Sequence, residues 1–366
     1  MTQISIVVGP LLAMVMVVGL YGPARRLARR LEHVDRPDSR KLHDSATPLI
    51  GGPLIGLGVL VALSVCGLLQ HEEVRWLVLA TAAMGTVGLL DDRYDVPPVL
   101  RLAVQFGVGL MMAWPAGIEI HRLGNLLAFG DIGIGPLAIP FTVICVVAMV
   151  NALNMLDGVD GLAGGLALVA LAWLAVAAAL IGDAVGLALA LILAGGCVGF
   201  LWFNARRPGQ PRARCFLGDA GSMSLGVALV WLAVRLAEQP APAMAPITAC
   251  WILAVPLLDV MTMTVRRARL GRHPFSPDRE HSHHLLLAAG LTPARTVAVF
   301  WGLGLVCGGI GVGGWWLGVP EPVLAVSFIA LVAGHYVLIQ RAWRFVRALR
   351  RLRRRREYRA GLGVSS

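Results

Sequence analysis

Long apolar runs separated by short polar segments dominate the chain. A helix needs roughly 20 apolar residues to cross the hydrocarbon core of a bilayer. Eleven runs approach or meet that length, and they lie near residues 4–22, 49–69, 74–90, 98–114, 136–153, 162–181, 184–204, 220–237, 244–264, 296–317 and 322–340. The pattern predicts an all-α polytopic integral membrane protein with about eleven transmembrane helices.

Composition supports the same class of protein. The 366 residues are 57% hydrophobic and only 14% charged, which excludes the surface of a soluble globular domain and the low hydrophobicity of a disordered chain. The first run has no basic residue before it and no small-residue cleavage site, so we expect an uncleaved span rather than a signal peptide. We expect one integral membrane domain over residues 1–340 and a basic tail over 341–366.

The net charge of +11 reports orientation rather than a nucleic-acid partner. All but three of the 32 lysine and arginine residues follow odd-numbered runs or lie in the tail; the exceptions are Arg75, Arg122 and Arg235. The positive-inside rule then predicts a periplasmic N-terminus and a cytoplasmic C-terminus in a bacterial inner membrane. The six cysteines show no C-x-x-C spacing, so neither a disulfide framework nor a zinc site is expected.

Five polar clusters fall on the cytoplasmic side, and the first two suit phosphate and metal chemistry. Lys41, the only lysine, and His43 precede the glycine pair at 51–52, which favours phosphate contact; a topology signal with a proline turn is the alternative. Asp91 and Asp92 end the third run. They suit a Mg²⁺ site, since Mg²⁺ favours one or two carboxylates plus substrate phosphates; an interfacial pair neutralised by Arg93 is the alternative.

The third and fourth clusters combine acids with glycines. Asn154, Asp157 and Asp160 alternate with glycines at 158 and 161, which predicts a helix break that opens the backbone to a ligand rather than a plain turn. Phe216 and Asp219 open the eighth run. Asp219 there caps the helix or holds a metal ion.

The fifth cluster is rich in histidine. His281, His283 and His284 follow Arg279, and their spacing does not place three zinc ligands on one helical face. A diphosphate-binding site fits better, with a solvated basic loop as the alternative. Within the ninth run, Asp259 is either functional or part of a structural ion pair, whereas the lone His335 is expected to be a packing residue.

Taken in order, DDRYD, NMLDGVDGL, FLGDAGS and DREHSHHL resemble the motifs of the polyprenyl-phosphate N-acetylhexosamine-1-phosphate transferase family, from about Asp35 to His284. Asp95, the RKLH run and the histidine loop resemble the WecA/TagO branch rather than the MraY branch, which has lysine at the position of Asp95. The resemblance implies transfer of a sugar-1-phosphate from a UDP-N-acetylhexosamine to undecaprenyl phosphate. The products would be UMP and a lipid-linked diphosphate sugar, with Mg²⁺ or Mn²⁺ as cofactor.

The resemblance also implies roles for individual residues. The catalytic set is Asp91, Asp92, Asp157, Asp160, His283 and His284; the substrate-binding set is Lys41, His43, Asn154, Phe216, Arg279 and His281; and the metal-binding set is Asp219, Asp91 and Asp92. In MraY relatives the aromatic that matches Phe216 stacks on uracil. Ser282 takes a position that is often isoleucine in relatives, a departure expected to be harmless.

Several alternatives stay open at this stage. The lipid phosphate attacks the β-phosphorus directly, or the reaction passes through an aspartyl-phosphate. GlcNAc is the expected sugar for initiating O-antigen or a related glycan, with FucNAc, QuiNAc or phospho-MurNAc-pentapeptide as alternatives. A transporter or lipid flippase is the alternative from another class, because intramembrane acids and broken helices also mark those proteins. Besides the two substrates we expect contact with membrane lipids and no nucleic acid, and a homodimer is one open oligomeric state.

Overall fold

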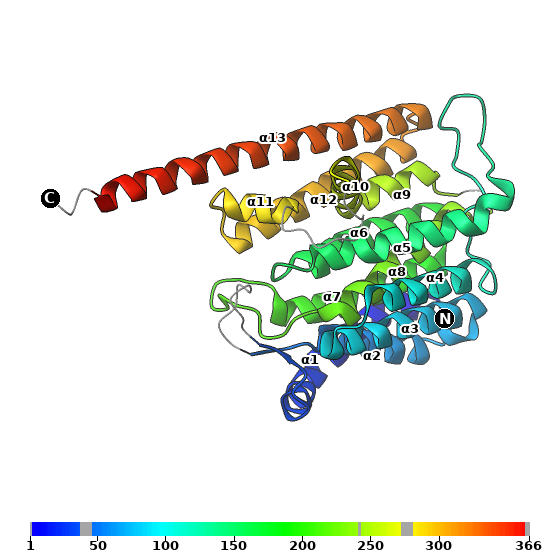
Figure 1. The fold of residues 1–366 in the computed structure, drawn as a ribbon. Helices are drawn as coiled ribbons and strands as arrows, with labels where there is room; N and C mark the ends of the chain where they lie inside the picture. Colours follow the sequence, from blue (N-terminus) through cyan, green and yellow to red (C-terminus); the bar gives the residue numbers. More distant parts are fainter. Residues whose placement is uncertain (1, 37–45, 241–242, 272–280, 363–366) are drawn as a thin grey trace.

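The computed structural model describes residues 2–36, 46–240, 243–271 and 281–362, and the side chains of residues 5–344 within those ranges (Figure 1). In these ranges the chain is almost entirely helical. The first helices are α1 (Thr2–Arg30), α2 (Gly51–Val65), α3 (Glu72–Tyr94), α4 (Pro98–Ala113), α5 (Ala138–Leu156) and α6 (Leu162–Ile181). The later ones are α7 (Ala184–Asn204), α8 (Gly218–Ala237), α9 (Pro246–Ile252), α10 (Ala254–Arg269), α11 (Ser282–Ala288), α12 (Pro293–Trp316) and α13 (Glu321–Leu362). Two 3-10 turns, η1 (Leu68–Gln70) and η2 (Gly135–Leu137), and two strands, β1 (Val34–Asp35) and β2 (Thr47–Pro48), complete the described elements.

Every predicted apolar run contains a helix. Eight described helices are long and apolar enough to cross a membrane, and α2 and α4 are shorter apolar helices of 15 and 16 residues. The class of the fold, an all-helical polytopic membrane protein, is therefore confirmed.

The ninth run was predicted as one continuous helix, and its continuity was wrong, although its two halves together have the length and polarity of one span. It forms two helices, α9 and α10, which are bent by 84° relative to each other. Pro256 supplies the physical reason: a proline has no N–H to donate, and its ring clashes with the carbonyl four residues earlier, here Ile252, where α9 ends. In Figure 1, α10 is seen nearly end-on while its neighbours run across the view.

Helix α8 is the centre of the bundle. It is buried along almost its whole length, as its largely apolar sequence between Asp219 and Arg235 requires. Glycines let neighbouring helices approach its backbone: a Cβ atom at Gly88 of α3 or at Gly52 of α2 would lie 2.3 Å from the amide nitrogen of Ala220 or Gly221. Such close backbone contact is typical of small residues in membrane helix packing. The first turn of α8 is thereby fixed against α2 and α3.

One end of the bundle is held by buried ion pairs. Arg235, in the last turn of α8, donates from Nε and Nη2 to the two carboxylate oxygens of Glu73 at 2.9 and 3.0 Å, and also pairs with Asp183. Asp183 caps α7, and Glu73 lies in the first turn of α3. A two-pronged arginine–carboxylate contact is among the stronger hydrogen-bonded pairs. These ion pairs explain why Arg235 lies at the end of the bundle that has few other basic residues.

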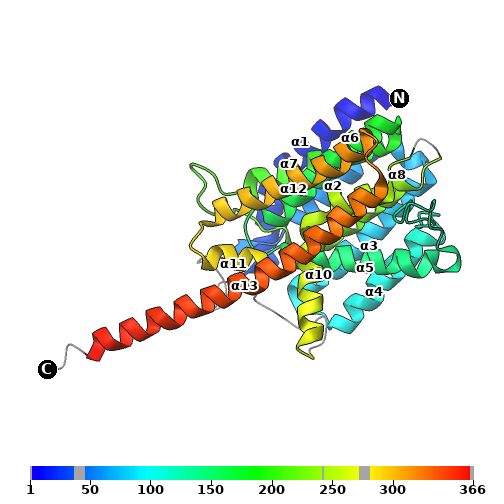
Figure 2. The ribbon, with the colours of Figure 1, turned by 90° about the horizontal axis from the view of Figure 1, so that it is seen from above.

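The last helix extends well beyond the bundle. Helix α13 continues without a break through residue 340, where the basic tail was expected to begin, and runs to Leu362. Figures 1 and 2 both show its C-terminal part projecting away from the other helices. Among the described residues, all six cysteines are free, as expected.

Candidate active site

A polar pocket of about 470 Å³ collects residues from all five predicted loops. Its lining includes six of the predicted site residues: Asp92, Asp157, Asp160, Phe216, Asp219 and His284. Asp35 of β1 represents the first loop in the lining, although it was not among the predicted site residues. Segments up to about 250 residues apart in the sequence therefore form one cavity, which we call the acid pocket.

Asp92 binds the first turn of α8 from α3. Its Oδ1 accepts a hydrogen bond from the amide of Asp219 at 2.9 Å, and its Oδ2 accepts one from the amide of Ala220 at 3.5 Å. The residue that precedes α8, Leu217, has no side-chain cap of its own. The helix cap that the sequence allowed for Asp219 is thus provided by Asp92, and Asp219 is left to face the pocket.

Asp91 is buried beside the pocket and is paired with an arginine that the sequence analysis counted only as a topology charge. Its Oδ1 accepts from the amide of Val96 at 2.8 Å, and its Oδ2 pairs with Arg101 of α4. Arg101 Nη1 also lies 3.7 Å from Asp219 Oδ2. The alternative in which Arg93 neutralises the acids is not seen, because Arg93 donates to the carbonyl of Leu31 at 2.8 Å.

Asn154 holds Asp219 in place from the end of α5. Its Nδ2 donates to Asp219 Oδ1 at 2.8 Å and to Ser222 Oγ at 3.0 Å. Asn154 itself does not line the acid pocket. In this geometry Asn154 orients the carboxylate of Asp219, and its expected role at the nucleotide stays a prediction.

The predicted helix break is confirmed, because α5 ends at Leu156 and α6 begins at Leu162. Gly161 adopts a φ of +88°, a conformation that favours glycine. Its amide donates to Asn204 Oδ1 at 2.6 Å, and Asn204 Nδ2 donates to the carbonyl of Cys215 at 2.9 Å. The buried Asn204 thus joins the break between α5 and α6 to the segment before α8.

Two carboxylates of this break differ in their surroundings. Asp160 pairs with Arg206, whose Nε lies 2.7 Å from Oδ2, and so retains a countercharge. Desolvation, together with the nearby carboxylates of Asp92 and Asp160, raises the pKa of Asp157 to about 8. These surroundings favour the protonated form of the Asp157 side chain. Asn204 and Arg206 were not predicted; one polar residue at the end of an apolar helix and an arginine two residues later were the only signals.

The three histidines take different positions. His284 lines the acid pocket, whereas His283 is buried and packs against the helix break, since a Cβ at Gly158 would lie 2.8 Å from its Nε2. Burial, with His284 nearby, lowers the pKa of His283 to about 3, so it is neutral. Neither ring nitrogen of His283 has a hydrogen-bond partner among the described residues. His281 turns instead toward Asp259.

The glycine pair at 51–52 does not offer its amides to phosphate. The amide of Gly51 donates to the carbonyl of Phe216 at 2.9 Å, and that of Gly52 to the carbonyl of Leu217 at 3.0 Å. This contact places Phe216 at the pocket, and the phosphate contact expected of Lys41 and His43 stays a prediction. Lys41, His43 and Arg279 lie outside the described residues.

The donor atoms suit a divalent cation only in part. Within the described ranges, no cluster of three or more histidine, cysteine or acidic side chains could hold a metal ion. Asp219 and Asp92 both face the pocket, however, and magnesium commonly binds one or two carboxylates and completes its shell with water and substrate phosphates. The acid pocket fits a magnesium site of this kind, in which two carboxylates hold the ion and water and substrate phosphates supply the other ligands.

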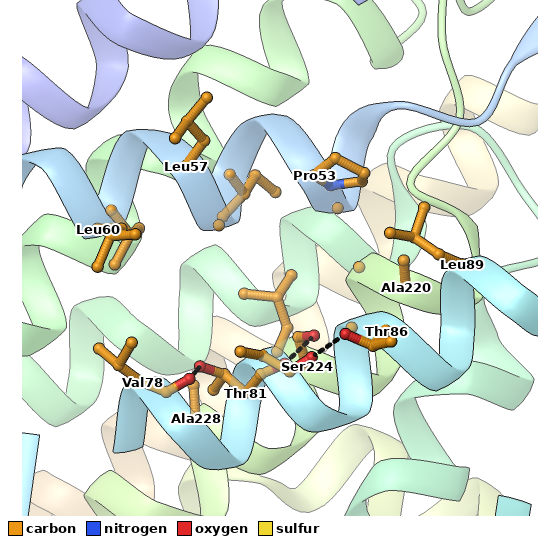
Figure 3. A pocket seen from close by; sticks show the side chains of 18 of the residues that line it. Pro53, Leu57, Leu60, Val78, Thr81, Thr86, Leu89, Ala220, Ser224 and Ala228 are labelled. Carbon is orange, nitrogen blue, oxygen red and sulfur yellow. Dashed lines mark hydrogen bonds between the residues drawn. The ribbon is translucent and has the colours of Figure 1, made fainter. Parts of the chain in front are cut away.

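An apolar groove of about 320 Å³ lies between α2, α3 and α8 (Figure 3). Its few hydroxyl groups are bonded to backbone, as when Ser224 donates to the carbonyl of Thr81 at 2.9 Å. Ala220 and Gly221 line this groove, while the adjoining Gly218 and Asp219 line the acid pocket. A single turn of α8 therefore separates an apolar surface from the acids.

These features define a class: a polytopic helical membrane protein with a charged pocket built from the loops at one end of its bundle. The family model described as glycosyl transferase family 4 matches residues 74–237. Three relatives named undecaprenyl-phosphate alpha-N-acetylglucosaminyl 1-phosphate transferase come from Haemophilus influenzae (35% identical), Yersinia pestis (34%) and Escherichia coli strain K12 (31%). The matches cover 90%, 91% and 91% of this chain and 93%, 91% and 90% of the relatives. The chain belongs to this family of membrane transferases, in the WecA-like branch.

Proposed function

We propose that this protein transfers N-acetylglucosamine-1-phosphate from UDP-GlcNAc to undecaprenyl phosphate. The observation that carries the proposal is the identity of 31–35% to transferases of that name along about nine-tenths of the chain. The acid pocket supports it, because six residues expected from the motifs line one cavity. The product is the lipid-linked diphosphate sugar that initiates a cell-surface glycan, such as O-antigen.

The bonds exchanged follow from the substrates. An oxygen of the lipid phosphate attacks the β-phosphorus of UDP-GlcNAc, and the bond from that phosphorus to the bridging oxygen breaks. UMP leaves with the bridging oxygen, and a new diphosphate joins sugar to lipid. With a second pKa near 6, the lipid phosphate is already mostly dianionic at neutral pH and needs little help from a base.

The protein residues then serve chiefly to position and neutralise two anions. Phe216 offers an aromatic face to the uracil, and His284 and Arg206 lie at the pocket to contact the diphosphate. Preorganised donors of this kind are usually the largest contribution to phosphoryl transfer.

Direct attack is favoured over an aspartyl-phosphate by the contacts of the acids. Asp91 is held by Arg101 and Val96, Asp92 by two amides of α8, and Asp160 by Arg206. Carboxylates held by several donors are weaker nucleophiles than free ones. Single-turnover incubation with labelled UDP-GlcNAc and no lipid tests this step: a stable label on the protein would contradict direct attack.

We further propose that Mg²⁺, or Mn²⁺ in its place, is the cofactor, held by Asp219 and Asp92 with Asp91 beside them. A bound divalent cation would neutralise the diphosphate charge that develops as UMP leaves. The residues named hold their positions through Asn154, the amides of α8 and Arg101.

For topology, we propose eleven crossings of a bacterial inner membrane, with the N-terminus periplasmic and the acid pocket cytoplasmic. The eight long helices, the bent α9–α10 pair and the shorter α2 and α4 support that count. All loops that line the pocket follow odd-numbered crossings and carry most of the basic residues.

A double-label experiment tests the proposed reaction. Purified protein in lipid vesicles is incubated with undecaprenyl phosphate, Mg²⁺ and UDP-GlcNAc labelled with ³²P at the β-phosphate and ³H in the sugar. Both labels should enter the butanol-extractable lipid in equal amounts. Sugar label without phosphate label would indicate ordinary glycosyl transfer, and no label in lipid would refute the enzyme; a flippase would move lipid without labelling it.

A further inference from the structure

A buried polar network outside the acid pocket joins α10, α11 and α13. Its centre is Asp259 of α10, which is 2% exposed. Asp259 Oδ2 lies 2.7 Å from His281 Nδ1, while Oδ1 accepts from the amide of Ser282 at 2.9 Å and from Ser282 Oγ at 2.7 Å. Three donors thus satisfy one buried carboxylate, and every donor comes from the start of α11.

The network continues to α13 with a defined direction. The Ser282 hydroxyl has one hydrogen, which it donates to Asp259, so the contact of 3.2 Å with His335 Nε2 requires that this nitrogen donate. In neutral His335 the other nitrogen, Nδ1, then accepts from Thr262 Oγ1 at 2.8 Å. His335, expected to be only a packing residue, is therefore bonded on both ring nitrogens.

Helix α11 depends on such contacts for its position. It has seven residues, fewer than an isolated helix needs to be stable in water, and His281, which precedes it, provides no side-chain cap. Asp259 supplies the missing cap from another helix. Next to the network, Met263, Leu285, Ile339 and Trp343 form a small apolar cluster that joins the same three helices.

This short helix carries the histidines of the active site. His283 and His284 lie in its first turn, with ring centroids 4.1 Å apart, and His284 reaches the acid pocket. A shift of α11 would therefore move His284 relative to Asp157 and Asp160. Displacement of a catalytic group by about 1 Å can reduce a rate by about 100-fold.

We propose that Asp259, Ser282 and His335 are positioning residues that fix α11, and with it His284, at the wall of the acid pocket. This inference rests on the proposed function for its kinetic effect, but the position of α11 is a separate physical claim. It gives Asp259 a role that the sequence left open between function and a structural ion pair. It also gives Ser282, whose departure from isoleucine was expected to be harmless, hydrogen bonds to Asp259 and His335.

The kinetic test is a double-mutant cycle. Asp259→Asn keeps the shape of the side chain but loses the charge that binds His281, and should lower kcat about 10- to 100-fold, with the KM for undecaprenyl phosphate unchanged. His284→Ala removes the group that is positioned. The double variant should be no slower than His284→Ala alone, because Asp259 acts through His284. Multiplied losses in the double variant would overturn the proposal.

The matched control is Asp183→Asn at the opposite end of the bundle. Asp183 is likewise a shielded acid with a charged partner, Arg235, but it is remote from the pocket. It should lower the apparent melting temperature while kcat per folded molecule stays at the wild-type value. An equal loss of kcat in Asp259→Asn and Asp183→Asn would show that Asp259 has only a structural role. Ser282→Ala is a milder change that should also lower kcat, and it replaces Asp259→Asn in this test if that variant folds poorly.

Hydrogen–deuterium exchange tests the position of α11 without reference to catalysis. Peptides that contain residues 282–288 should exchange faster in Asp259→Asn and Ser282→Ala than in wild type, while peptides from α8 should not change. Unaltered exchange in α11 would refute the positioning claim. Failure of wild type in the double-label assay would refute the transferase instead, so the two failures are distinguishable.

Discussion

Removal of Arg101 should leave a buried negative charge without its partner. The Asp91 side chain is 3% exposed and that of Arg101 is 28% exposed. Breaking a buried ion pair by truncating one partner typically costs about 3–5 kcal/mol. Asp91 keeps its hydrogen bond from the Val96 amide, and water reaches Arg101, so we expect Arg101→Met to cost about 3 kcal/mol, at the lower end of that range.

The assay is the apparent melting temperature of purified protein in detergent. Arg93→Met is the matched control, because among the described residues that nearby, exposed arginine contacts the carbonyl of Leu31 and the ring of Tyr94 rather than an acid. It should change stability by less than about 0.5 kcal/mol.

A second variant separates charge from packing. Adding Asp91→Asn to Arg101→Met removes the unpaired charge, so the double variant should melt at a higher temperature than Arg101→Met alone. If the double variant melts lower than either single variant, or if Arg101→Met behaves like Arg93→Met, the reasoning about the ion pair is wrong.

Three further predictions concern the scaffold. Gly88→Ala forces a Cβ against the backbone of Ala220 and should lower both melting temperature and transferase activity, whereas Gly107→Ala, with open space around it, should leave both nearly unchanged. Asn204→Leu strands two backbone groups at a cost of about 1–3 kcal/mol each, and a melting temperature within 1 °C or so of wild type would contradict that estimate. Because the pKa of His283 is lowered, the unfolded chain binds a proton at this histidine at a higher pH than the folded chain does. The contribution of neutral His283 to stability is therefore complete above pH 6.5 and declines as the pH falls toward 3. His283→Gln should therefore show a shallower loss of melting temperature between pH 7 and pH 5; an unchanged slope would argue against it.

The sequence predicted the helices well because a bilayer imposes one length and one polarity on every crossing. It failed at the ninth run, where Pro256 splits a stretch that hydropathy alone treats as continuous. Long-range partners were also missed. Arg101 and Arg206 carry the same charge as the topology arginines, and nothing local in the sequence shows that they face Asp91 and Asp160.

The acids themselves could be predicted as site residues, because a carboxylate in or next to a membrane helix costs free energy and is rarely present without a function. The structural role of each acid could not be predicted. Which of Asp92 and Asp219 caps α8 depends on the approach of α3 through Gly88, and the division between His284 and His283 depends on where α11 packs. The role of each residue therefore depends on packing between segments that are distant in the sequence.

The central claim is that the acid pocket transfers a phosphosugar to a lipid phosphate. The most direct measurement is UMP release from UDP-GlcNAc by the purified protein with undecaprenyl phosphate and Mg²⁺, for wild type, Asp219→Asn and the control Asp183→Asn. Wild type and Asp183→Asn should release UMP at similar rates per folded molecule, and Asp219→Asn should be slower by at least about 100-fold. Undiminished release by Asp219→Asn would contradict the account.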